Sequence, residues 1–156
     1  ILPFKHADRT DLARPLARQM ARAGAVLLDR ADLIAPVPAH WRRLIGRRYD
    51  QAALLARALG ALSGRPVWPD LLRRVRRTPP LADRGAAERS LVVAGAFALS
   101  RQGREAVRGL QVLLVDDVMT SGATAQACAK ALLEAGAAAV DVLAAARVPD
   151  PRLRDA

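Results

Sequence analysis

The stretch of residues 112–124 limits what this chain can fold into more than any other part of its sequence. It reads V-L-L-V-D-D-V-M-T-S-G-A-T, so four aliphatic residues lead into two acids and then into a turn rich in hydroxyl groups. An aliphatic run without polar alternation is typical of a strand buried on both faces of a parallel sheet. Residues 125–135 follow with the pattern of a helix. The stretch therefore predicts a strand, a turn and a helix of an α/β fold.

Asp116 and Asp117 stand at the carboxyl end of this strand, where open α/β sheets bind their ligands. Carboxylates there accept hydrogen bonds from a sugar diol or help to hold a metal-loaded ligand. The turn at residues 120–124 offers N–H groups at a helix N-terminus, three hydroxyl groups and one glycine, which suit a phosphate monoester. Together these features indicate ribose 5-phosphate. A turn merely capped by Thr120 or Ser121 would leave the two acids unexplained.

Two other motifs share parts of this pattern and do not fit. The P-loop string G-x-x-x-x-G-K-[ST] does not occur in the chain. A receiver domain places its acid pair after its first strand, with further functional residues much later, and too little chain follows Asp117 for that.

Composition places the chain among globular proteins of one domain. It has 156 residues, 52% of them hydrophobic, and only 3% aromatic, so Leu, Val and Ala are expected to fill the core. No apolar run long enough for a membrane span and no signal peptide is visible, and we expect a cytoplasmic protein without membrane insertion. The single cysteine, Cys128, excludes an internal disulfide and is expected to be buried in a helix. The net charge of +10 favours a phosphorylated ligand or nucleic acid.

Strands and helices are expected to alternate along the chain, which predicts a three-layer α/β fold with a mostly parallel central sheet. The expected helices are residues 11–23, residues 51–63 with Asp50 as cap and Leu54, Leu55, Leu59 and Leu62 facing inward, and one turn at 88–93. The other expected strands are residues 33–37, 71–75, 95–99 and 138–146, with an irregular loop at 78–87 and a polar connection at 100–109.

Three further segments join the central stretch in a resemblance to a known family. They are P-V-P-A-H at residues 36–40, R-R-Y-D-Q-A-A-L-L-A-R-A-L at 47–59, and R-R-T-P-P-L with E-R at 76–89. With residues 112–124, which resemble the phosphoribosyl pyrophosphate (PRPP) motif of type I phosphoribosyltransferases, they are similar to the ComF and GntX-like branch, the competence protein F family. The branch commonly carries an N-terminal zinc-binding cysteine module, which does not occur in residues 1–156, so it either precedes Ile1 or is lacking in this member. Its usual R-G-F-N-Q reads R-R-Y-D-Q, so Asp50 replaces an asparagine.

The resemblance implies one phosphoribosyltransferase-like domain over residues 1–156, with a small hood that contains a flexible loop at about 76–99. It implies transfer of ribose 5-phosphate from PRPP to an unknown acceptor with release of pyrophosphate. Mg²⁺ would arrive with PRPP, without metal ligands of the protein's own. The alternative that the resemblance implies is a non-catalytic protein of competence and DNA uptake, which binds single-stranded DNA and a helicase-like partner. A regulator that senses PRPP is a third reading, and a dimer is possible in each.

The resemblance also assigns residues to roles. Asp116 and Asp117 are expected to contact the ribose and to serve catalysis. The PRPP-binding set is completed by Met119, Thr120, Ser121, Gly122, Ala123 and Thr124. The expected pyrophosphate-binding set is Val37, Pro38, Ala39, His40, Arg42 and Arg43. Arg76 and Arg77 are expected in the flexible loop, where they and the nearby Arg73 and Arg74 would neutralise pyrophosphate, bind nucleic acid or form a solvated strand end. His40 is either an acid–base group or a loop residue.

Overall fold

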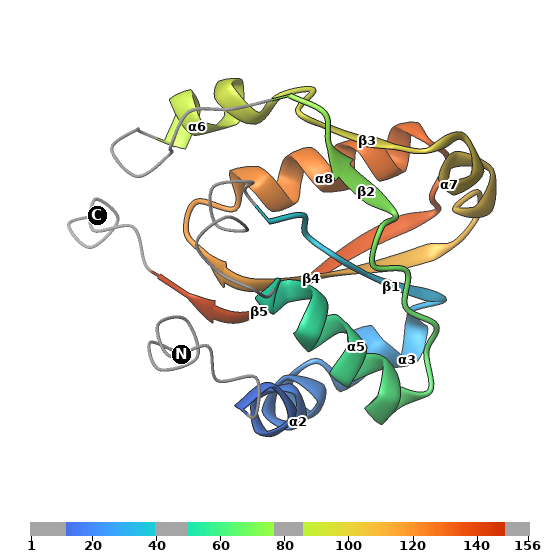
Figure 1. Ribbon diagram of the computed structural model, residues 1–156, viewed down its shortest axis with the longest axis vertical. Coiled ribbons are helices and arrows are strands. Elements are labelled where there is room, and N and C mark those ends of the chain that lie inside the picture. Colours follow the sequence, from blue (N-terminus) through green and yellow to red (C-terminus); the bar gives the residue numbers. More distant parts are fainter. Residues whose placement is uncertain (1–11, 40–49, 77–85, 149–156) are drawn as a thin grey trace.

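The computed structural model describes residues 12–39, 50–76 and 86–148. A parallel sheet lies at its centre, with the strand order β1 (Leu33–Pro36), β4 (Gln111–Met119) and β5 (Ala139–Arg147). Val67 adds an isolated parallel bridge to Ile34 on the outer side of β1. Figure 1 shows this sheet edge-on between two layers of other elements. The parallel sheet and the layered α/β architecture are as the sequence predicted.

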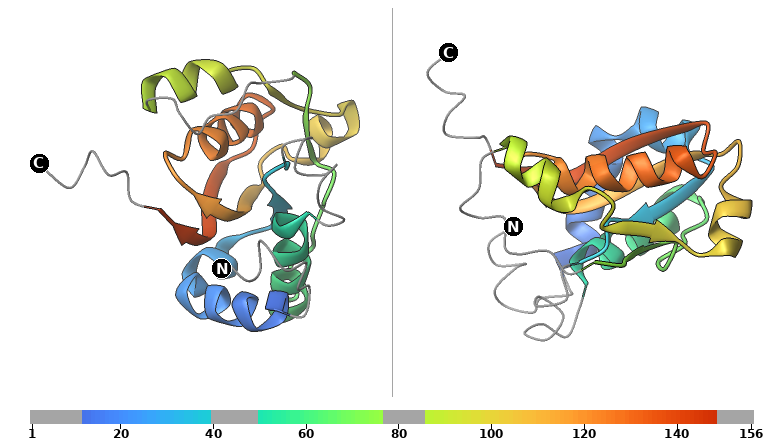
Figure 2. Two further views of the ribbon diagram at one scale, coloured as in Figure 1. Left: turned by 60° about the vertical axis from the view of Figure 1, so that its left-hand side comes forward. Right: turned by 90° about the horizontal axis from the view of Figure 1, so that it is seen from above.

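Helices cover one face of the sheet: α2 (Ala13–Ala23), α3 (Ala25–Arg30) and α5 (Gln51–Ser63). Figures 1 and 2 show α2 and α5 side by side beneath the strands. Leu55 and Leu59 of α5 are fully buried there against Leu113 and Val115 of β4. Leu62, which was expected to face inward, is 49% exposed, so that prediction was wrong. It lies in the last turn of α5, two residues before the C-cap Gly64.

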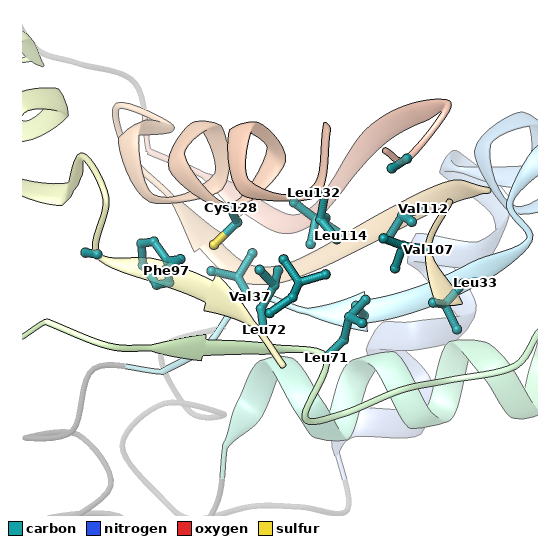
Figure 3. Close-up of a cluster of buried hydrophobic side chains, with 14 of the residues drawn as sticks. Leu33, Val37, Leu71, Leu72, Phe97, Val107, Val112, Leu114, Cys128 and Leu132 are labelled. Atoms are coloured by element: carbon teal, nitrogen blue, oxygen red, sulfur yellow. The ribbon is translucent and has the colours of Figure 1, made fainter. Parts of the chain in front are cut away.

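The opposite face is covered by α8 (Ala123–Glu134) and by an antiparallel pair of short strands, β2 (Leu72–Arg74) and β3 (Phe97–Leu99). Two short helices flank this layer, α6 (Ala86–Val93) and α7 (Arg101–Ala106). Figure 3 shows the core between these elements, where Cys128 and Leu132 of α8 meet side chains of the strands. As expected, Cys128 is a buried member of the hydrophobic core.

The alternation of side chains along β4 separates the two cores. Val112 and Leu114 belong to the core on the α8 side, whereas Leu113 and Val115 belong to the core on the α5 side. Successive side chains of a strand point to opposite faces of its sheet. Two features of this region differ from the sequence prediction: β4 continues through both acids to Met119, and the polar connection after Ser100 contains α7.

In the described ranges, no helix combines the length and the apolar composition that a membrane crossing requires. The expected irregular loop at 78–87 lies almost entirely outside the described residues. The elements on its two sides are nevertheless described, and β2 and β3 pair with each other in register from Leu72–Leu99 to Arg74–Phe97.

Candidate functional site

The central strand β4 extends beyond β1. The pairing of β1 with β4 ends at Pro36 and Val115, with one further hydrogen bond of 2.8 Å from Val37 N to Val115 O. On its other side, β4 stays paired with β5 as far as Met119 and Arg147. From Asp116 onward, β4 therefore has a strand neighbour on one side only among the described residues. Such a point, at the carboxyl ends of diverging parallel strands, is where open α/β sheets bind ligands.

Asp116 and Asp117 lie at this point and face different layers. Asp116 follows the alternation of Leu114 and raises the pKa of Cys128 on α8, so it lies on the α8 side. Asp117 follows Val115 and raises the pKa of Asp50 at the start of α5, so it lies on the α5 side.

The same two carboxylates also fix the local backbone. Asp116 Oδ1 accepts from the N–H of Asp117, and Asp117 Oδ1 accepts from the N–H of Val118, each at 2.8 Å. Asp117 is 8% exposed, whereas Asp116 is more accessible.

The turn between β4 and α8 forms an open set of hydrogen-bond donors. Gly122 precedes α8 with φ of 78°, a left-handed conformation that favours glycine. Ala123 N donates to Ser121 Oγ at 3.4 Å. Within the described part of the chain, the N–H groups of Ser121, Gly122 and Thr124 have no protein acceptor. Free N–H groups at the N-terminus of a helix form an anion-binding site.

The loop after β1 offers fewer donors than the sequence suggested. The N–H of Val37 is used by the sheet, and Pro38 has no N–H. The N–H of Ala39 has a small lowering effect on the pKa of the Asp50 carboxyl group. His40, Arg42 and Arg43, which the sequence also placed here, lie outside the described residues. The loop does lie next to the end of β4, since Val37 is bonded to Val115. Of its three residues, only Ala39 has an N–H group that the sheet does not use.

Asp50 joins this site, although the sequence indicated only a helix cap. The cap itself is present, because Asp50 Oδ1 accepts from Ala53 N at 3.1 Å. Burial, and then the negative charge of Asp117, raise the pKa of the Asp50 carboxyl group, against the lowering effect of hydrogen bonds from Ala53, Ala52 and Ala39. The signal in the sequence was Asp50 itself, in the position where the family motif has asparagine. Its distance along the chain from Asp117 concealed the electrostatic interaction between the two acids.

The arginines at the base of the hood have separate roles. Arg76 donates to the backbone oxygens of Val92 at 3.0 Å and Ala94 at 2.7 Å, so it joins the chain after β2 to the end of α6. Arg74 is half-buried, with its guanidinium carbon 4.6 Å from the centre of the Phe97 ring. Its charge lowers the pKa of Cys128, which places Arg74 on the α8 side together with Asp116. Arg77 lies outside the described residues.

Cys128 lies in α8, the helix that follows the turn at residues 120–122, and it is not accessible to solvent. Burial is the main cause that raises the pKa of its thiol, with a smaller contribution from Asp116. A buried neutral thiol packs as a small apolar group. Among the described residues, no group of three His, Cys, Asp or Glu side chains is arranged to hold a metal ion.

Comparisons with curated proteins give two names. The chain is 33% identical over 146 residues to the DNA utilization protein YhgH of Salmonella typhi, which covers 89% of this chain and 62% of that protein. It is 34% identical over 143 residues to competence protein F of Haemophilus influenzae, which covers 90% of this chain and 61% of that protein. The chain thus spans about three-fifths of the length of these relatives. No family model matches the chain.

Solved structures share the fold. The glutamine PRPP amidotransferase of B. subtilis superposes with a TM-score of 0.57 at 25% identity, over 85% of this chain and 26% of that chain. The hypoxanthine phosphoribosyltransferase of Trypanosoma cruzi superposes with a TM-score of 0.51 at 15% identity, over 90% of this chain and 76% of that chain. The second likeness shows the fold over most of both chains.

Proposed function

Because this chain is a homologue of competence protein F with the type I phosphoribosyltransferase fold, we propose that it binds PRPP and transfers ribose 5-phosphate to an acceptor. The observation that carries this proposal is the end of β4. There, two acids directly precede a turn whose N–H groups at the start of α8 have no protein acceptor in the described residues. We also propose that the chain forms one such domain, with a hood at about 76–99, and acts in the cytoplasm.

The 5-phosphate would bind at the turn. Ser121, Gly122 and Thr124 would donate their N–H groups, and the hydroxyl groups of Thr120 and Thr124 would add further donors. The partial positive charge of the α8 N-terminus would stabilise the bound anion. Met119 and Ala123 would flank the phosphate as backbone of the same turn.

The ribose would lie beside the two acids. Asp116 is the more accessible of them and lies on the same side of the sheet as α8, which begins at the phosphate turn, so it would make the main contact with the ribose hydroxyl groups. Asp117 is buried on the α5 side and would act next to the loop after β1. Both carboxylates already accept a backbone N–H each, which fixes their orientation before the ligand arrives.

In the transfer, the bond between the anomeric carbon and pyrophosphate breaks as an acceptor attacks that carbon. Positive charge develops on the ribose ring, and the nearby carboxylates would stabilise it. The phosphate turn would hold the substrate in line for attack. Ala39, with His40, Arg42 and Arg43, would bind the pyrophosphate, assisted by Arg76 and Arg77 from the hood. Mg²⁺ bound to PRPP would neutralise the leaving group and retain water ligands.

The proposal is tested by titrating PRPP with Mg²⁺ into the protein by calorimetry. Saturable binding is expected for the natural chain, and its loss is expected for the double variant Asp116→Asn, Asp117→Asn. Asp70→Asn is the matched control, since Asp70 is an exposed acid outside the site. A folded natural chain that does not bind PRPP would contradict the proposal. Release of pyrophosphate in a screen of acceptors would then establish turnover.

A second function is favoured by the names of the relatives and by the charge. The relatives are called a competence protein and a DNA utilization protein, and the net charge of +10 suits a nucleic-acid partner. In this reading the chain keeps the fold but acts in DNA uptake by binding single-stranded DNA and a helicase-like protein. Binding of single-stranded DNA that weakens with salt and that PRPP does not displace, without release of pyrophosphate, would favour it over the enzyme.

A further inference from the structure

The arginines of α2 form a row along one exposed face of the helix. Arg14, Arg18 and Arg22 follow one another at intervals of four residues, and all three are exposed. Residues at this interval are neighbours on the same side of a helix, about 6 Å apart along its axis. Ala17 and Met20 of the same helix are buried in the core on the α5 side of the sheet. The arginine row therefore faces solvent.

No acid neutralises the arginine row within the described residues. α2 contains neither Asp nor Glu, and neither does α5, which lies beside it in Figures 1 and 2. The adjoining α3 has one acid, Asp29, and no ion pair among the described residues joins it to the row. The three positive charges are thus presented together and without a counter-charge from these helices.

On α7 and α8, exposed cations are balanced at the same helical spacing. Arg101 of α7 pairs with Glu105 at 3.3 Å, and Lys130 of α8 pairs with Glu134 at 3.8 Å. In α2, the residue four positions after each of the first two arginines is another arginine. Like charges at this spacing destabilise a helix. An anionic polymer bound along α2 would remove this repulsion.

The regular spacing of the row favours a nucleic acid over an acidic protein surface. A nucleic acid carries one phosphate in each nucleotide, so its charges recur at regular steps, and the guanidinium fork of arginine binds two phosphate oxygens at once. In the described ranges the aromatic side chains are Trp68 and Phe97, and neither is exposed for stacking on bases. The contacts of this surface would therefore be with the backbone and not with the bases.

We propose that Arg14, Arg18 and Arg22 bind the phosphate backbone of single-stranded DNA without regard to its base sequence. The proposal rests on the second function proposed above, whose binding surface it identifies. α2 packs in the core on the α5 side of the sheet, whereas α8, which begins at the proposed phosphate turn, packs in the core on the other side (Figure 1). The two surfaces lie on opposite faces of the sheet, so PRPP and DNA do not compete.

The test measures binding of a single-stranded oligonucleotide by fluorescence anisotropy over a series of salt concentrations. The α2 variant carries Arg14→Gln, Arg18→Gln and Arg22→Gln. The matched control, the α7 variant, removes the same charge from exposed positions in and directly after α7, with the changes Arg101→Gln, Arg104→Gln and Arg108→Gln.

Loss of three phosphate contacts is expected to reduce the slope of log affinity against log salt by about 2 in the α2 variant. The affinity at about 0.1 M salt is expected to fall about a hundredfold. Each single replacement in the row is expected to reduce the slope by about 0.7. The α7 variant is expected to keep most of the slope and of the affinity.

The stability of the α2 variant separates lost binding from lost structure. Glutamine forms helices about as well as arginine does, and the replacement removes like charges from neighbouring turns. The urea midpoint of the α2 variant is therefore expected to equal or exceed that of the natural chain. Oligothymidine and a mixed-sequence oligonucleotide of the same length are expected to bind alike, and PRPP with Mg²⁺ is expected to leave both affinities unchanged.

Equal effects of the α2 and α7 variants on DNA binding would overturn the role of the arginine row alone. Polyglutamate that binds more tightly than the oligonucleotide, and that the α2 variant no longer binds, would overturn the assignment of the row to nucleic acid. Displacement of DNA by PRPP would overturn the separation of the two surfaces. Absence of DNA binding by the natural chain would overturn both this role and the second proposed function.

Discussion

Asp116 and Asp117 are consecutive in β4, yet they face opposite layers of the protein. Asp116 lies within electrostatic reach of Cys128 on α8, and Asp117 within reach of Asp50 at the start of α5. The two adjacent acids therefore lie on opposite faces of the sheet at the carboxyl end of β4. One acid stands on the side of the proposed phosphate turn and the other on the side of the loop after β1.

The charge of Asp117 is expected to act on Asp50. Replacement of Asp117 by Asn removes a negative neighbour, so the pKa of the Asp50 carboxyl group is expected to fall. Asp116→Asn is the matched control, because Asp116 lies on the other side of the sheet and is expected to leave the pKa of Asp50 closer to its present value. Carboxyl ¹³C NMR over a pH titration measures both. An equal effect of the two variants would contradict the placement of the acids on opposite faces.

The stability of the protein is expected to depend on pH through Asp50. Its pKa is raised above the ordinary value of 3.8, chiefly by burial, so ionisation disfavours the folded state. The contribution of Asp50 to stability is complete below pH 3.8 and is lost as the pH rises through the pKa of the folded state. Asp50→Asn is therefore expected to raise the free energy of unfolding at pH 7, and this advantage is expected to shrink toward pH 4. Urea denaturation at several pH values checks the trend, with Asp70→Asn as control.

Arg76 is expected to hold the base of the hood together. Its guanidinium group binds the backbone oxygens of Val92 and Ala94, where α6 ends. Arg76→Ala is expected to lower the free energy of unfolding by about 1 kcal/mol and to speed amide exchange in α6. Arg73→Ala is the control, since Arg73 is an exposed neighbour in β2. Equal exchange in the two variants would contradict the structural role of Arg76.

Cys128 is expected to be inert in the folded protein. It is fully buried, and burial raises the pKa of its thiol. A thiol-specific reagent is expected to label it about a hundredfold more slowly, or slower still, in the native state than in denaturant, because reaction requires local opening. Fast native labelling, measured by mass spectrometry at pH 8, would show that α8 opens readily and that its packing is weaker than the structure indicates.

Much of the fold follows from local patterns. The aliphatic runs that contain Ile34 and Leu113 and the amphipathic repeat around Leu55 and Leu59 predicted the central strands and α5, because burial on one or both faces leaves a clear mark in the sequence. The caps at Asp50 and Gly64 also marked the bounds of α5. The PRPP-like motif located the candidate site at the end of the central strand.

Other features were set by contacts that no local pattern records. Asp has a low preference for strands, so β4 was expected to end before Asp116, but its pairing with β5 continues to Met119. The helix α7 has no apolar repeat and contains Gly103, and only the cap at Ser100 marks it. The electrostatic interaction of Asp50 with Asp117 depends on the crossover that brings α5 against β4.

The alternation of β4 has a consequence for how the sequence of this strand can change. Val112 and Leu114 fill one core, Leu113 and Val115 fill the other, and the two acids continue the same alternation. Insertion or deletion of one residue within β4 would move every side chain beyond it to the opposite face. Such a change would exchange the environments of Asp116 and Asp117 and disturb both cores at once. The register that keeps the cores intact is therefore also the register that orients the two acids, so a variant of β4 that still packs well will also have kept them in place.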